Sequence, residues 1–114
     1  MRFLGFAVAT VVFMAAIGPA QAKSLSKKEV EMCRWGGDVA KAAQQSKLAG
    51  TTLWRARQHV KAQAFPEPWM ARMASGITEQ TYASKSRLRP LAVEKAYYDG
   101  CIIHERSRSA RAKT

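Results

Sequence analysis

Polar and apolar residues repeat with a helical period along most of this chain. Between Lys27 and Gln45 the polar residues recur in steps of four and three, and their alternating charges attract neighbours one turn apart. The opposite face collects Met32, Cys33, Gly36, Val39, Ala40 and Ala43. Both patterns run unbroken through Gly36-Gly37, so they predict a helix there rather than a turn or a phosphate-binding loop.

The ends of this first helix carry recognisable signals. Ser26 and Glu29 have the spacing of a capping box, and Gly50 is a typical C-terminal stop after Leu48-Ala49. A glycine in the buried stripe costs about 1 kcal/mol of helix propensity relative to alanine. We therefore expect a second helix to approach closely at Gly36.

Three more helices follow in the same pattern. Thr51 or Thr52 caps a second helix that runs to about Ala64. A third opens at Pro68 and frays near residues 82–84, and a fourth opens at Pro90. The predicted inner face of the fourth helix holds Val93, Ala96, Tyr97, Gly100 and His104. The sequence therefore predicts an all-α fold, a compact bundle of about four helices.

The N-terminal segment has the layout of a secretory signal peptide. Arg2 precedes an apolar run from Phe3 to Ile17, and Ala20-Gln21-Ala22 is a small-residue cleavage motif. The run is too short for an ordinary membrane span, although an uncleaved anchor is the rival interpretation. We predict a cleaved segment 1–22, one helical domain over 23–105 with no membrane span, and a disordered basic tail over 106–114.

Export to the periplasm or the medium bears on the two cysteines, because exported thiols usually pair. We predict a disulfide between Cys33 and Cys101 that joins the first and last helices. Each cysteine lies near a glycine of its predicted inner face, which fits close packing of those helices. Closing so long a loop stabilises the fold by roughly 4 kcal/mol on the chain-entropy argument.

Catalytic motifs are lacking in this sequence. It has no nucleophile elbow, no paired carboxylates on an apolar face and no Cys-x-x-Cys pair, so we expect neither an enzyme nor a cofactor. The alternatives are a metal site formed by Cys33, His59, Cys101 and His104, or an enzyme pocket that uses the two histidines. The oxidising compartment favours the disulfide and no metal.

The charge of the chain favours anionic partners. There are 19 Lys and Arg residues against 8 Asp and Glu, a net charge of +11, and loss of Arg2 leaves about +10. The first functional hypothesis is a non-catalytic binding protein for an anionic envelope component or an acidic protein, with nucleic acid less favoured. Its candidate contacts are Lys85, Arg87, Arg89, Arg106, Arg108 and Arg111.

An apolar patch gives the alternative hypothesis. Trp54, Phe65 and Met70 would anchor one protein partner, as in an inhibitor, an immunity protein or a chaperone. The competing interpretation places Trp54 and Phe65 in the core, with the cations of residues 54–61 solvated.

Two short motifs resemble a group of small exported bacterial helical proteins of uncharacterised function. These are Cys-x-x-x-Gly-x-x-Ala at Cys33, Gly37 and Ala40, and Tyr-x-x-x-Cys at Tyr97 and Cys101. The plan is also similar to periplasmic acid-stress chaperones and to helical immunity proteins. The resemblance implies the fold and the compartment, and it carries over no functional residue.

Overall fold

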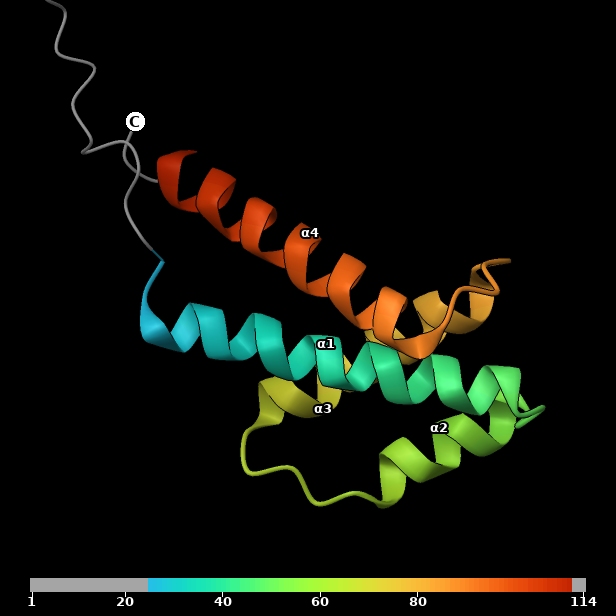
Figure 1. The fold of residues 1–114 in the computed structure, drawn as a ribbon. Helices are drawn as coiled ribbons and strands as arrows, with labels where there is room; N and C mark the ends of the chain where they lie inside the picture. Colours follow the sequence, from blue (N-terminus) through green and yellow to red (C-terminus); the bar gives the residue numbers. More distant parts are fainter. Residues whose placement is uncertain (1–24, 112–114) are drawn as a thin grey trace, which may run out of the picture.

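Four helices make up the part of the chain that the computed structural model describes, residues 25–111 (Figure 1). They are α1 (Lys27–Leu48), α2 (Leu53–Ala62), α3 (Pro68–Ala83) and α4 (Pro90–Arg111), and no strand occurs among these residues. The predicted all-α bundle is confirmed. The predicted signal peptide, 1–22, lies outside the described residues.

The helix ends form where the local sequence signals place them. Ser26 Oγ accepts from the Glu29 amide at 3.1 Å while the Glu29 carboxylate accepts from the Ser26 amide at 3.4 Å, which completes the capping box. Gly50, after the end of α1, has a φ of +86°, a left-handed conformation that glycine adopts without strain. Thr52 caps α2, which stops two residues before the predicted end because Gln63 is extended.

α1 is the central helix, and the other three pack against it (Figure 1). α4 runs antiparallel to α1, joined by the disulfide between Cys33 and Cys101, whose Cα atoms are 5.5 Å apart. α3 lies parallel to α1, and α2 returns antiparallel to both. The prediction that a disulfide joins the first and last helices is confirmed.

Small side chains dominate the core. The buried apolar residues are Cys33, Ala40, Ala43, Ala56, Ala74 and Ile77. Larger apolar surface is covered at one edge, where the Trp35 ring meets the rings of Phe65 and Trp69 edge-on, with centroids 6.0 and 5.6 Å apart. Alanines bury little area each, so the fold gains much of its stability from close backbone approach and from the disulfide.

The glycine pair in α1 makes that close approach possible. A methyl group at Gly36 would lie 2.5 Å from Cε1 of Tyr97 and 2.7 Å from Cε of Met73. One at Gly37 would lie 3.3 Å from the carbonyl oxygen of Glu94. The expected approach of a second helix at Gly36 is confirmed, and α3 joins α4 in making it.

The inner face of α4 differs from the predicted one. Gly100 faces open space and His104 is exposed, whereas the buried side continues from Tyr97 through Cys101 to Glu105. Glu105 is buried because the Arg108 guanidinium donates to its carboxylate at 3.1 and 2.6 Å. Because the buried face of α4 includes the carboxylate of Glu105, the pattern of apolar residues in the sequence does not identify that face. Burial, and then the charge of Glu105, raise the pKa of Tyr97.

The predicted disordered tail is wrong for residues 106–111, because α4 continues to Arg111. The pairing of Arg108 with Glu105 one turn earlier supports this extension. The tail was predicted from its basic residues and from its lack of acids and of apolar periodicity. Glu105, the carboxylate that pairs with Arg108, lies just before the predicted start of the tail. Residues 112–114 lie outside the described range.

Replacing Cys33 and Cys101 by alanine should lower the free energy of unfolding by roughly 4 kcal/mol. The bridge spans 68 positions, so its loss frees a large denatured ensemble. Denaturant unfolding of the oxidised chain, the reduced chain and the double variant measures this. Equal stability of the oxidised and reduced chains would contradict it.

Gly36→Ala should destabilise the fold by about 1–2 kcal/mol, since the Tyr97 ring must move to admit a methyl group. Gly100→Ala is the matched control in a helix interior, where nothing lies within 4 Å of the added carbon. It should instead gain up to about 1 kcal/mol of helix propensity. Thermal unfolding distinguishes the two, and equal shifts for both would refute close packing at Gly36.

Candidate functional site

Five segments of the chain meet at one end of the bundle. We call this end the basic end and define it as residues 44–57 and 80–93. It contains the last turn of α1, the start of α2, the end of α3, the connection 84–89 and the first turn of α4 (Figure 1). The Tyr82 hydroxyl donates to the carbonyl of Thr51 at 2.9 Å, which ties the end of α3 to the turn between α1 and α2.

The connection 84–89 is held in place by two side chains of α1. Lys47 Nζ donates to the carbonyl oxygens of Thr81, Ser84 and Ser86 at 3.1, 2.9 and 2.8 Å. The buried Gln44 amide donates to the carbonyls of Ser86 and Leu88 at 3.2 and 2.9 Å. These bonds fix the backbone and leave the side chains of Lys85, Arg87 and Leu88 exposed.

Carboxylates are missing from the basic end, since residues 44–57 and 80–93 contain no Asp or Glu. The acids that border residues 80–93 in the sequence, Glu79 and Glu94, pair with Arg57 and Lys41 respectively. The hydrogen bond with Arg57 lowers the pKa of Glu79 and raises that of Arg57. Within residues 25–111, four exposed cations at this end have no carboxylate partner: Arg55, Lys85, Arg87 and Arg89.

The six basic residues predicted from sequence fall into two separate groups. Lys85, Arg87 and Arg89 lie before the start of α4. The other three, Arg106, Arg108 and Arg111, lie in its last two turns, roughly 25 Å away along the helix. The second group lies among carboxylates, and its hydrogen bond with Glu105 raises the pKa of Arg108. The first group lies in a segment without Asp or Glu, and Arg55 at the start of α2 lies in the other such segment of the basic end.

The predicted apolar patch divides in a similar way. Trp54 is exposed at the basic end, so its core interpretation is wrong, whereas Phe65 and Met70 are half-buried and Phe65 packs against Trp35. Sequence reasoning missed three exposed leucines at the same end, Leu48, Leu88 and Leu91. The alternation of leucine with arginine over residues 87–91 was the available signal.

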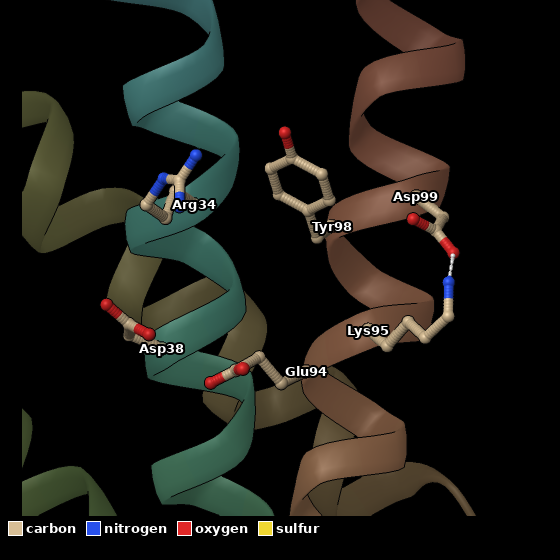
Figure 2. Close-up of a pocket in the computed structure, with 6 residues that line it drawn as sticks. All are labelled: Arg34, Asp38, Glu94, Lys95, Tyr98 and Asp99. Atoms are coloured by element: carbon tan, nitrogen blue, oxygen red, sulfur yellow. Dashed lines mark hydrogen bonds and ion pairs between the residues drawn. The ribbon is translucent and has the colours of Figure 1, made fainter.

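A shallow groove lies between α1 and α4, outside the basic end (Figure 2). The Arg34 guanidinium lies 5.9 Å from the centre of the Tyr98 ring, and Lys95 pairs with Asp99 at 2.7 Å. The hydrogen bond with Asp99 raises the pKa of Lys95. The lining residues are Arg34, Asp38, Glu94, Lys95, Tyr98 and Asp99. Mixed signs and an open shape give this groove no preference for one charged ligand.

Residues 25–111 hold no cluster of three His, Cys, Asp or Glu side chains that fits a metal ion. His59 and His104 are exposed on α2 and α4, and both cysteines are in the disulfide. The alternative metal set is therefore not assembled. None of the described helices is long and apolar enough to span a membrane.

Comparison of the chain with protein-family models, curated proteins and solved structures found no match. The likeness to small exported bacterial proteins therefore stays a prediction, and the chemistry of the basic end carries the functional argument.

Lys47→Met should destabilise the fold by about 2–3 kcal/mol, because three carbonyl oxygens lose a charged donor. It should also speed amide exchange in the connection 84–89. Lys61→Met, on the exposed side of α2, is the control and should change stability little. Denaturant unfolding and hydrogen exchange measure both effects. Unchanged exchange at Leu88 in Lys47→Met would show that other contacts hold the connection.

Proposed function

We propose that this protein is a small, non-catalytic binding protein of the periplasm or the cell exterior, which meets an anionic partner through its basic end. The observation that carries the proposal is the set of four exposed cations, Arg55, Lys85, Arg87 and Arg89, in two segments without carboxylates that meet at one end of the bundle (Figure 1). A surface of one sign attracts and orients an anionic partner, whereas a mixed surface largely cancels its own field.

The geometry strengthens this proposal beyond net charge. Four other cations of the bundle have carboxylate partners in the fold: Lys41 with Glu94, Arg57 with Glu79, Lys95 with Asp99 and Arg108 with Glu105. Lys47 is committed to three backbone carbonyls. In the described part of the chain, the four cations of the basic end have no such partner, so they can exchange their counterions for an anionic partner.

The compartment is part of the proposal. A disulfide in a small helical bundle persists in an oxidising environment and is rare in a reducing one. The predicted signal peptide over residues 1–22 points the same way. Anionic envelope components, such as phosphate-bearing lipids and polysaccharides, are abundant partners there.

A protein-interaction module is the second candidate, and the exposure of Trp54 favours it. Exposed tryptophans are common binding anchors. Phe65 and Met70 are half-buried, so that surface would rest on Trp54 and its exposed leucine neighbours rather than on the predicted trio.

Two variants that each remove four positive charges test the proposal. Arg55, Lys85, Arg87 and Arg89 become glutamine in one, and Lys27, Lys28, Arg72 and Arg106, all exposed and outside the basic end, become glutamine in the other. Both start at Lys23 and are bound to immobilised dextran sulfate across a salt series. The first should bind at least about tenfold more weakly than the second near 0.1 M salt.

Equal weakening of the two variants would mean that only net charge matters, and the basic end would then not be a site. Salt screens ion-pair contacts, so the unmutated chain should bind dextran sulfate more weakly as the salt concentration rises. Binding that does not weaken with salt would also contradict the proposal.

A further inference from the structure

We propose that the partner of the basic end is an anionic lipid surface, in which the cations contact headgroup phosphates and Trp54, Leu88 and Leu91 insert between the headgroups. This inference rests on the proposed function and names its partner class. It comes from the apolar side chains that share the basic end with the cations.

Exposed apolar residues are concentrated at this end. Five large hydrophobic side chains are exposed among residues 25–111, and four of them belong to the basic end: Leu48 at 38%, Trp54 at 66%, Leu88 at 56% and Leu91 at 65%. The fifth, Ile103, lies in the distal half of α4. Exposed apolar side chains gathered at one end of a fold are candidates for a contact surface.

The cations and apolar groups alternate along the chain. Trp54 precedes Arg55, and Leu88 lies between Arg87 and Arg89. A lipid interface receives both classes, since phosphates lie above the acyl chains and tryptophan favours the boundary between them. A soluble polyanion or a nucleic acid binds the same cations and stacks on the indole, but it offers the leucines no apolar medium.

The fixed backbone of the connection supports insertion. The carbonyl of Leu88 accepts from the buried Gln44 amide, and the carbonyl of Ser86, two residues earlier, accepts from both Gln44 and Lys47. The leucine side chain is therefore presented outward from an ordered loop. Binding then loses less conformational entropy than it would with a flexible segment.

Vesicle binding tests this inference with the oxidised chain starting at Lys23, so that the apolar leader contributes nothing. The probes are vesicles of phosphatidylcholine alone and of equal parts phosphatidylcholine and phosphatidylglycerol. The chain should partition into the anionic vesicles and not into the neutral ones. Neutralising Arg55, Lys85, Arg87 and Arg89 should lower the partition coefficient by about fivefold per cation.

Apolar insertion has its own variants, all at exposed positions where folding is not at risk. Trp54→Ser and the pair Leu88→Ser with Leu91→Ser should each lower partitioning roughly tenfold and leave dextran sulfate binding unchanged. Ile103→Ser is the control and should bind like the unmutated chain. Brominated lipids should quench part of the tryptophan fluorescence, and Trp54→Phe should remove that quenched part.

The outcomes separate the two proposals. Salt-sensitive binding to dextran sulfate, together with vesicle binding that is indifferent to the Trp54 and leucine variants, would overturn the lipid inference and leave the proposed function standing. Tighter binding of single-stranded DNA than of anionic vesicles would also overturn it. If the four basic-end cations matter no more to dextran sulfate than their control set does, both proposals fail together.

Discussion

The contact between α1 and α4 at Gly36 and Gly37 is the constraint on which the rest of the bundle depends. Without a side chain at Gly36, the Tyr97 ring and the Met73 methyl group converge on the α1 backbone from α4 and α3. The disulfide lies one turn away, so the covalent link and the closest packing reinforce each other. With a core composed mainly of alanine, a looser contact would leave little apolar burial to replace it.

Much of this arrangement could be predicted from the sequence because its signals are local. The Ser26 and Glu29 capping box, the left-handed Gly50 and Pro68 at a helix start each act within one turn of chain. The disulfide could be predicted because the sequence has only two cysteines and a predicted signal peptide. The capping and turn signals depend on no distant residue, and the helices they delimit match the predicted ones closely.

The errors arose where a distant or unusual partner decides the outcome. Glu105 is buried because Arg108 neutralises it, and a carboxylate on the inner stripe moved the predicted face of α4 toward Gly100 and His104. The same pair carries the helix to Arg111, beyond the predicted start of a tail. The six candidate cations were predicted as one group because all of them are basic. In the structure they form two groups, one before the start of α4 and one in its last turns.

Net charge turns out to be a coarse guide to this molecule. Lys47 is basic, yet it works as a structural donor to three carbonyls, and Arg57 serves an ion pair between α2 and α3. Among the described residues, Arg55, Lys85, Arg87 and Arg89 have no ion pair in the fold, and they lie in segments that contain no carboxylate. The informative quantity is therefore the distribution of unpaired cations over the surface.

The position of the disulfide also affects how the protein survives proteolysis. Cys33 and Cys101 lie near the start and the end of the described chain, so α2, α3 and the connection 84–89 all fall inside one covalent ring. The connection carries the exposed Lys85 and Arg87, which makes it a target for trypsin-like proteases. A single cut there opens the ring without releasing a fragment, and both halves stay tethered across α1 and α4.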